Sequence, residues 1–259
     1  MRQSYIAVIA ETLLKTCVAE SAGYRLDDVR CTCSRSPWSA PEETSSFTIV
    51  FVRRGCFRRR VNGVEHVLDS VTAYFERPGE EQQVAHPVDG GDACTQLTLP
   101  AEYVRDGPEP QFTEARVDLA QRLLLRCSDE DEFVDRAVAI ADRLFGRTAP
   151  VHARPFVDHA REAIAADPTL GLQELARIAA VSPHHLSRTF RAETGETISR
   201  YRNRVRVRVA LERIGDGEVS LARLAAELGF ADQAHLSRVV RGELRRTPTE
   251  LRIDLQAVR

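Results

Sequence analysis

Two segments in the last third of the chain place serine, arginine and other polar side chains at matching positions. The triplet Leu-Ser-Arg stands at residues 186–188 and again at residues 236–238. An arginine can donate two hydrogen bonds to guanine, and a serine can bond to several base edges. Such side chains near the start of a helix suit contact with bases in a DNA groove, so the repeat predicts two DNA-contacting sites in one chain.

Each triplet lies on the second of two helices that the apolar spacing predicts. Apolar residues recur at helical spacing in 172–179 and in 221–228, and a short turn follows each run. The next helix opens at a capping residue, Ser182 in the first copy and Asp232 in the second. We therefore predict two helix-turn-helix motifs, whose second helices enter the major groove.

The exposed face of each second helix supplies the candidate DNA contacts. Leu186 and Phe190 are four residues apart and should point into the core, as should Leu236 and Val240. The outward-facing candidates are His184, Ser187, Arg188, Arg191, Gln233, His235, Ser237, Arg238 and Arg241. A glutamine can make two hydrogen bonds to adenine. Because the copies differ just before the triplets, they should contact different bases.

Composition and charge fit a globular protein with a DNA-facing part. Of its 259 residues, 43% are hydrophobic and 29% are charged. Residues 151–259 carry 18 Arg and 14 acidic residues, whereas the first 150 carry 18 basic and 24 acidic residues. No apolar run is long enough for a membrane helix or a signal sequence. We expect a cytoplasmic protein with no membrane partner.

The first part of the chain has a different pattern. Residues 4–19 have apolar positions at helical spacing and predict one amphipathic helix. Short β-rich runs separated by turn residues then extend from 29 to 99, and Asn62-Gly63 between two of them predicts a hairpin. Several short strands at this spacing predict a small sandwich or barrel.

Helical periodicity returns after Pro110. Apolar residues share one face in 117–124 and in 133–144, and helices of this kind between two domains commonly pair with a copy of themselves. We therefore expect a homodimer. Residues 146–150, with Gly and Pro, mark the predicted domain boundary.

Three segments give the last part of the chain a family resemblance. Residues 195–201, 227–238 and 247–252 resemble the AraC/XylS family of transcriptional regulators, and the match covers about 154–255. The resemblance implies seven helices there, with two helix-turn-helix units held by a long linker helix. It implies base-facing positions at His184, Ser187, Arg188, Gln233, His235, Ser237 and Arg238. Upstream it implies a cupin-like sensor and dimerisation part.

The resemblance also decides an ambiguous segment. Residues 202–210 alternate polar and apolar as a half-buried strand would, but Tyr201, Val205 and Val209 also fall four apart. We choose the linker helix, with Arg204, Arg206 and Arg208 on its exposed sides.

The upstream domain holds the candidate sensor residues. AraC-type barrels take a small organic ligand inside, so the resemblance implies an effector cavity. Its candidate lining residues are Trp38, Phe51, Phe57, Tyr74 and His86. Cys31, Cys33 and Cys94 on predicted strands, with His86, could form a metal or redox site. The two cysteines two residues apart could equally be small core residues that share a strand face.

Together these patterns predict an α+β multidomain protein. A cupin-like β-barrel or sandwich with flanking helices is expected at 1–110, a helical dimerisation segment at 111–149, and an all-α domain with two helix-turn-helix motifs at 150–259. The predicted function is a DNA-binding transcriptional regulator, an activator that contacts RNA polymerase and responds to a small-molecule effector. Two alternatives stay open. One is a ligand-independent or thiol- or metal-responsive regulator whose first domain dimerises, and the other is an enzyme on a cupin-like barrel fused to a DNA anchor. We expect no cofactor and no catalysis, because no nucleophile motif is present.

Overall fold

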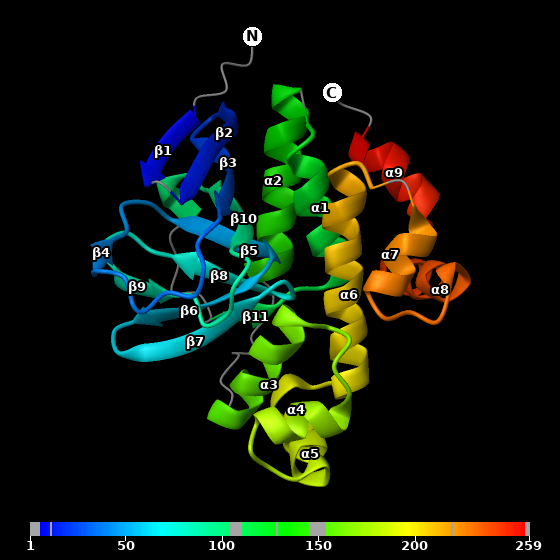
Figure 1. Cartoon of the computed structure of the whole chain (residues 1–259). Coiled ribbons are helices and arrows are strands. Elements are labelled where there is room, and N and C mark those ends of the chain that lie inside the picture. The colour runs from blue at the N-terminus through cyan, green and yellow to red at the C-terminus, as the bar shows by residue number, and fades with distance from the viewer. Residues whose placement is uncertain are drawn as a thin grey trace. The chain divides into compact units, whose positions relative to one another are not determined.

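The computed structural model describes residues 6–10, 12–103, 110–127, 129–145, 154–218 and 220–256. The chain divides into two compact units, Met1–Val151 (unit 1) and His152–Arg259 (unit 2). Strands dominate unit 1 and helices make up unit 2, so the expected α+β class is confirmed (Figure 1). The predicted boundary at 146–150 lies outside the described residues.

Unit 1 is built on two antiparallel sheets. The seven-stranded sheet has the order β1-β2-β3-β10-β5-β8-β11, and the four-stranded sheet has the order β4-β9-β6-β7. The strands are β1 Ile6–Ala10, β2 Leu13–Ser21, β3 Tyr24–Cys31, β4 Glu42–Glu43, β5 Thr48–Arg54, β6 Cys56–Val61, β7 Val64–Asp69, β8 Thr72–Glu76, β9 Glu81–Ala85, β10 Asp92–Thr98 and β11 Gln111–Phe112. Apolar residues of both sheets pack together in one cluster. The expected small β-sandwich is therefore confirmed.

Strand β5 has a nearly continuous apolar sequence because both of its faces are covered by other parts of unit 1. Val50 and Val52 pack between the sheets, whereas Ile49 and Phe51 face the helices that follow the sandwich. Successive side chains of a strand point to opposite faces, so a strand buried on both sides is apolar throughout.

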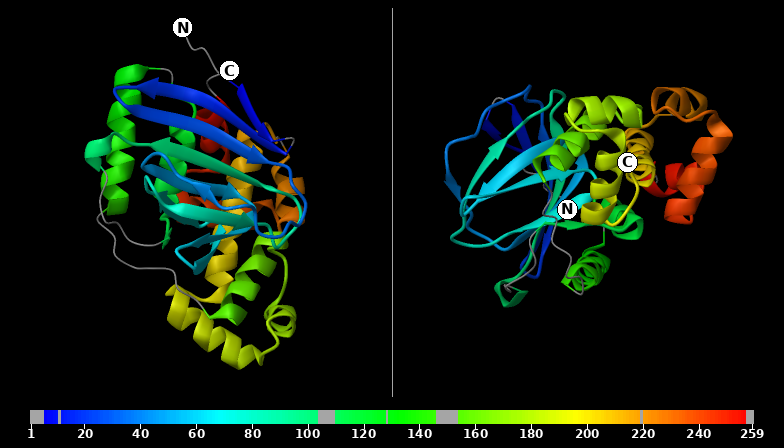
Figure 2. Two further views of the ribbon diagram at one scale, coloured as in Figure 1. Left: turned by 90° about the vertical axis from the view of Figure 1, so that its left-hand side faces the viewer. Right: turned by 90° about the horizontal axis from the view of Figure 1, so that it is seen from below.

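Two helices cover the outer face of the seven-stranded sheet (Figure 2). They are α1 Ala115–Leu124 and α2 Glu130–Phe145, and the short helix η1 Ala101–Tyr103 precedes them. Phe133, Ile140 and Leu144 are buried against the sheet. The apolar face from which a homodimer was expected is therefore packed within unit 1, and that periodicity no longer supports pairing of two copies.

The predicted helix at 4–19 is wrong, because residues 6–10 form strand β1 and residues 13–21 form strand β2. Strand β2 pairs antiparallel with β3 from Leu13↔Cys31 to Ser21↔Tyr24. The two strands join through Ala22 and Gly23, both with positive φ (50° and 82°), as a two-residue hairpin turn requires. Helical spacing of the apolar residues was misleading because the ladder to β3 supplies the hydrogen bonds that a helix would otherwise make.

The other β-rich runs are confirmed as strands. Val61 pairs with Val64 across the predicted turn, where Asn62 and Gly63 have φ of 50° and 79°. Positive φ at both central residues is the signature of the type I′ turn.

Unit 2 contains the seven helices that the resemblance implies, within its described residues 154–218 and 220–256. They are α3 Pro155–Ala166, α4 Leu172–Ile178, α5 Pro183–Thr194, α6 Ile198–Gly215, α7 Leu221–Glu227, α8 Gln233–Leu244 and α9 Pro248–Gln256. The two helix-turn-helix pairs are α4–α5 and α7–α8. Across the described part of the whole chain, the helices are too short or too polar to cross a membrane.

The linker helix α6 is confirmed, but its arginines are not where the sequence suggested. Arg206 and Arg208 are 6% and 0% exposed, and Arg204 forms an ion pair with Glu196. Helix α6 packs against α3, α5, α8 and α9, so nearly every side of it is covered. Arg206 donates from Nε to the Pro168 carbonyl at 2.9 Å, so its guanidinium stabilises the chain before α4.

Candidate functional site

The helices α5 and α8 are equivalent, residue for residue, at a spacing of 50 in the sequence. Both begin at the predicted caps: Ser182 Oγ accepts the His185 N–H at 3.2 Å, and Asp232 Oδ1 accepts the His235 N–H at 2.6 Å. Leu186 and Leu236 are both fully buried. The caps and the buried leucines fix the same rotation of each helix, so Ser187-Arg188 and Ser237-Arg238 occupy the same outward positions.

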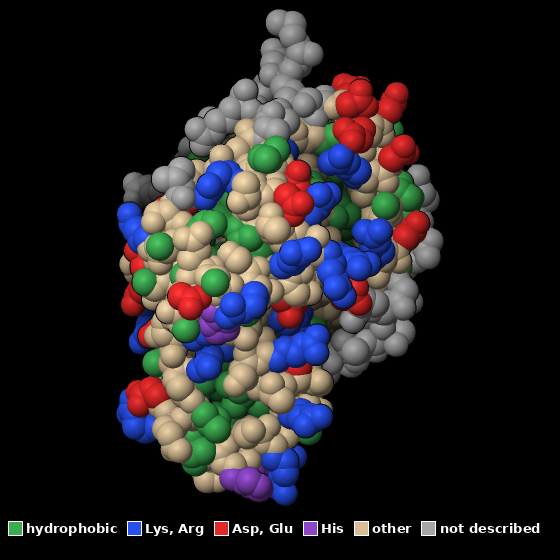
Figure 3. Space-filling model, turned by 90° about the vertical axis from the view of Figure 1, so that its right-hand side faces the viewer, with side chains coloured by type: hydrophobic (Ala, Val, Ile, Leu, Met, Phe, Trp, Pro, Cys, Tyr) green, Lys and Arg blue, Asp and Glu red, His purple; other side chains and the backbone are tan. Residues whose placement is uncertain are grey.

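The arginines on the outer faces of α5 and α8 differ from most exposed arginines of unit 2. The surface in Figure 3 carries many Lys and Arg side chains. Most of those on unit 2 are paired, for example Arg177 with Glu174 at 2.5 Å and Arg223 with Glu227 at 2.8 Å. The exposed arginines on α5 and α8 are Arg188, Arg191, Arg238 and Arg241, and none of them has a carboxylate within ion-pair distance among the described residues. Their charge is free to meet a phosphate or a base.

The other predicted DNA-contacting residues differ in how far their side chains are exposed to solvent. His184 and Gln233 are exposed, whereas Ser187, Ser237 and His235 are half-buried. His235 is committed to its own motif, because Nδ1 accepts the Ala231 N–H at 3.3 Å and the ring lies 5.4 Å from Phe230. We therefore expect His235 to stabilise the turn first and to contact DNA only through Nε2.

The equivalent of His235 in the first motif is His185. Its ring lies 5.2 Å from that of Phe156, much as His235 lies beside Phe230. The sequence analysis named His184 and His235 as candidate contacts and did not name His185.

Unit 1 has a cavity of about 690 Å³ between its sheets, and this cavity is open to solvent. Of the predicted effector residues, Phe57, Tyr74 and His86 line it, and so do all three predicted thiols, Cys31, Cys33 and Cys94. The sequence did not single out the charged lining residues Lys15, Glu42, Glu43, Glu76 and Asp92. Only the pairing of distant strands brings these residues together.

Trp38 and Phe51, the other two predicted effector residues, do not line this cavity. Phe51 lies on the face of β5 that packs against the helices. Trp38 lies beside the β6 side chain Arg60, whose guanidinium carbon is 4.0 Å from the centre of the indole. Aromatic residue type alone did not show which face of a strand each side chain occupies.

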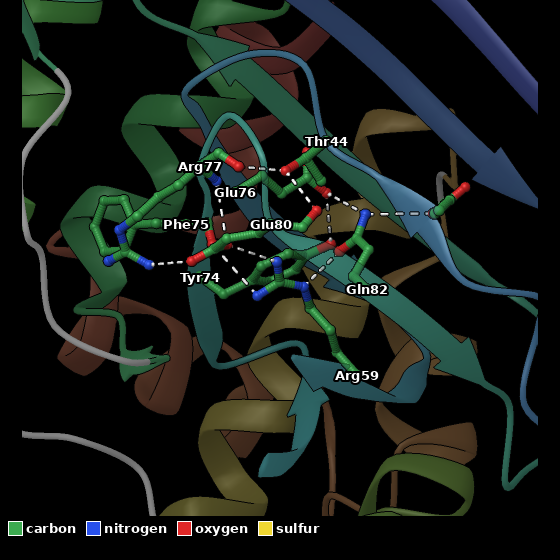
Figure 4. Close-up of polar contacts among 9 residues, drawn as sticks. Thr44, Arg59, Tyr74, Phe75, Glu76, Arg77, Glu80 and Gln82 are labelled. Carbon is green, nitrogen blue, oxygen red and sulfur yellow. Dashed lines mark hydrogen bonds and ion pairs between the residues drawn. The ribbon is translucent and has the colours of Figure 1, made fainter. Parts of the chain in front are cut away.

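A buried arginine organises one end of the cavity wall (Figure 4). Arg59 on β6 is 3% exposed. It donates to Gln82 Oε1 at 2.5 Å, to the Phe75 carbonyl at 3.3 Å and to Glu80 at 3.3 Å. These bonds connect β6 and β9 of one sheet with β8 of the other. Gln82 in turn donates to Glu76 Oε1 at 3.4 Å, so the network reaches a carboxyl group on the cavity wall.

Burial of Glu76 predicts that the folding stability of unit 1 depends on pH. Burial raises the pKa of its carboxyl group above the usual value. A carboxyl whose pKa is raised on folding contributes stability at low pH that is lost as the pH rises through the folded-state pKa. We expect Glu76→Gln to be more stable than the wild type near pH 7, with the difference closing as the pH falls toward about 4.

Urea unfolding followed by fluorescence of the lone Trp38 would measure this difference at several pH values. Glu43→Gln, an exposed change on the same cavity, is the control. An equal gain for both variants, or a gain at Glu76 that does not depend on pH, would contradict the role of burial.

The three predicted thiol residues line the cavity, but only Cys31 and Cys33 contact each other, and Cys94 lies outside the cluster that these two form with His86. Cys31 Sγ donates to Cys33 Sγ at 2.9 Å, and Cys94 Sγ donates to Asp92 Oδ1 at 3.4 Å. His86 Nε2 lies 2.9 Å from Asp92 Oδ2. Burial raises the pKa of the Cys33 thiol to about 12, and its hydrogen bond with Cys31 adds to the rise. Burial likewise raises the pKa of Cys94.

Comparison with known proteins gives matches to unit 2 and to the whole chain. A family described as "Helix-turn-helix domain" matches residues 175–253, from α4 to α9. Regulatory protein SoxS of Salmonella typhimurium is 31% identical over 86 residues, which cover 33% of this chain and 80% of SoxS. The structure of ToxT from Vibrio cholerae with an unsaturated fatty acid bound aligns over 100% of this chain and 99% of its own, with 12% identity and a TM-score of 0.40. A transcriptional regulator with an AraC-type DNA-binding domain from Chromobacterium violaceum aligns over 39% of this chain and 92% of its own, with 24% identity and a TM-score of 0.38.

Proposed function

This chain belongs to the AraC/XylS family of DNA-binding transcriptional regulators, and from that premise we propose that α5 and α8 enter successive major-groove turns of one DNA site. The observation that carries the proposal is the set of arginines without carboxylate partners at equivalent positions of α5 and α8. A helix-turn-helix presents the first part of its second helix to base edges. Arg188 and Arg238 lie in that part, and each can bond to guanine O6 and N7.

The remaining outward residues have complementary roles in this proposal. Gln233 at the start of α8 can make two hydrogen bonds to adenine, and the first motif has Pro183 at the equivalent position. The two motifs would therefore read different bases. Arg191 and Arg241 lie three residues beyond the first arginines, where phosphate contacts would orient each helix.

Selection of binding sites from a pool of random duplexes, with the purified full chain, tests this proposal. The selected sequence should contain two conserved segments about one helical turn apart, and footprinting should protect both. A single conserved segment, protected over one turn only, would show that one motif alone reads the DNA.

We propose that the cavity of unit 1 binds a small organic effector with a cationic or donor-rich part and an apolar part. Four carboxylates line the cavity, whereas the ammonium of Lys15 is already held by Gln96 at 2.7 Å and Asp27 at 3.3 Å. Val50 and Phe57 supply an apolar surface beside them. Carboxylates in a cavity are stabilised by a positive charge or by hydrogen-bond donors, so amines or polyols with an apolar part fit better than fatty acids.

Thermal unfolding with matched panels of amines and carboxylic acids tests this preference. A ligand that binds only the folded chain stabilises it by about 2.7 kcal/mol at 100 times its dissociation constant. Amines should raise the melting temperature and carboxylic acids should not. Stabilisation by carboxylic acids alone would reverse the assigned ligand class.

Activation through RNA polymerase, a homodimeric state and a cytoplasmic location complete the proposed function, which is regulation rather than catalysis. A dimer would have to use a surface other than the buried face of α2. Sedimentation of the full chain at micromolar concentration tests it, and a monomer with full affinity for the selected DNA would remove the dimer from the proposal.

A further inference from the structure

Three potential metal ligands converge on one wall of the unit 1 cavity. Cys31 Sγ, Cys33 Sγ and a ring nitrogen of His86 all lie within 4.8 Å of one another. Two thiolates and one imidazole form a donor set that suits thiophilic ions such as Zn²⁺ and Cu⁺, and a fourth position can be filled by water or a carboxylate. We propose that this cluster binds one thiophilic metal ion.

The fold brings these residues together from separate segments of the chain. Cys31 is the last residue of β3, and Cys33 follows in the connection toward β4. His86 follows β9 and exchanges two backbone hydrogen bonds with Ser36, at 3.0 and 3.1 Å. This bridge holds the connection against the four-stranded sheet, so the three donors are positioned by backbone pairing before any ion binds.

Asp92 prepares His86 to act as a ligand. It pairs with Cys31 in the ladder between β10 and β3, and its Oδ2 lies 2.9 Å from His86 Nε2. A metal-binding histidine usually donates its other ring N–H to a carboxylate or carbonyl group. With the proton on Nε2, the Nδ1 atom keeps its lone pair, which here faces Ser36 Oγ at 3.2 Å. A bound ion would replace the hydroxyl as the partner of Nδ1.

The surroundings favour a binding site over two small core residues. Cys33 is half-buried, and all three donor residues line a cavity that has room for an ion and its fourth ligand. The cysteines in apolar packing elsewhere are different: Cys127 lies in the cluster beneath α1 and α2, with its thiol directed to Asp129 and Glu132.

Metal binding by the full chain, purified in reductant and stripped of metal, tests the proposal. We expect a competitive titration with a chromophoric chelator to give one Zn²⁺ per chain. Co²⁺ in its place should show thiolate-to-cobalt charge-transfer absorption. Cys31→Ser together with Cys33→Ser should abolish both signals, whereas Cys127→Ser, a control cysteine of similar burial, should retain them.

Asp92→Asn keeps the shape of the positioning residue and removes its charge. It should weaken Zn²⁺ affinity about 10- to 100-fold while the Co²⁺ charge-transfer bands persist at saturation. His86→Gln should weaken affinity and shift the Co²⁺ ligand-field bands, because a nitrogen ligand is lost. These spectra separate loss of a ligand from loss of folding, which circular dichroism would monitor.

Two results would overturn the proposal. One is a wild-type chain that binds neither Zn²⁺, Cu⁺ nor Co²⁺ under reducing conditions. This result would overturn the proposal whether or not Cys31 and Cys33 form a disulfide after the reductant is removed. The other is unchanged affinity in the double cysteine variant. Neither measurement uses DNA or an effector, so the outcome is independent of the proposed function.

Discussion

Replacing Arg188 or Arg238 by alanine should lower affinity for the selected DNA site about 5- to 150-fold in each case. A guanine contact with two hydrogen bonds contributes roughly 1–3 kcal/mol of discrimination, which gives this range. The side chains are exposed and unpaired in the described chain, so their removal leaves no buried carboxylate without a partner. Folding stability should therefore stay within about 0.5 kcal/mol of the wild type.

The two variants should differ in the base pair whose identity they no longer recognise. Each should relax the sequence preference at one position, and the two positions should lie about one helical turn apart. Because the contacts are in different motifs, the effects of a double variant should add in free energy. Quantitative binding to the selected site and to its single-base variants, at fixed salt, provides the measurement.

Arg136→Ala is the matched control, since Arg136 is an exposed arginine of unit 1 that pairs with Glu132 at 2.6 Å. It removes the same charge and should leave DNA affinity nearly unchanged. If Arg188→Ala instead weakens binding to every sequence alike and reduces the salt dependence, its role is a phosphate contact.

Gly91→Ala should destabilise unit 1 by about 2–5 kcal/mol. Gly91 has a φ of +64°, and an ideal Cβ there would lie 2.0 Å from the Cys31 carbonyl oxygen and 2.9 Å from its carbon. Left-handed backbone costs a side-chain-bearing residue roughly 1–2 kcal/mol, and forced overpacking costs about 1–3 kcal/mol more. Both contacts are with backbone, so the junction between β3 and β10 would have to move.

Gly63→Ala separates the two causes. Gly63 has a similar φ of +79°, but a Cβ there would meet nothing within 4 Å. The Gly63→Ala substitution should cost only the free energy of placing a side-chain-bearing residue in the left-handed backbone conformation, about 1–2 kcal/mol. Urea unfolding monitored by Trp38 would report on unit 1 in both variants. Equal destabilisation of the two variants would show that the close approach to Cys31 does not contribute to the loss of stability in Gly91→Ala.

Local signals in the sequence were sufficient wherever neighbouring residues decide the structure. Ser182 and Asp232 cap their helices because a side-chain oxygen needs only the amide three residues ahead. Asn62 and Gly63 form their turn because both can adopt positive φ. For the same reason the outward positions of Arg188 and Arg238 followed from leucines two residues before them.

The sequence-based predictions were wrong where a segment distant in the sequence determines the local structure. The helical spacing of apolar residues in 4–19 predicted a helix, but β2 pairs with β3 in a hairpin. The arginines of α6 turned away from solvent because the connections before α4 and before α6 supply a carbonyl, that of Pro168, and a carboxylate, that of Glu196, as partners. Phe51 and Phe57 were indistinguishable by type, and only the two covered faces of the sandwich separated them.

The sequence by itself determined that this protein has two helix-turn-helix motifs and which of their residues face outward, because caps, turns and helical spacing act over a few residues. The tertiary structure alone decided what surrounds those motifs and the cavity. It left Arg188, Arg191, Arg238 and Arg241 without carboxylate partners among the described residues, and it brought Cys31, Cys33 and His86 to one wall. Contacts between residues tens of positions apart depend on strand register and packing, which no local pattern encodes.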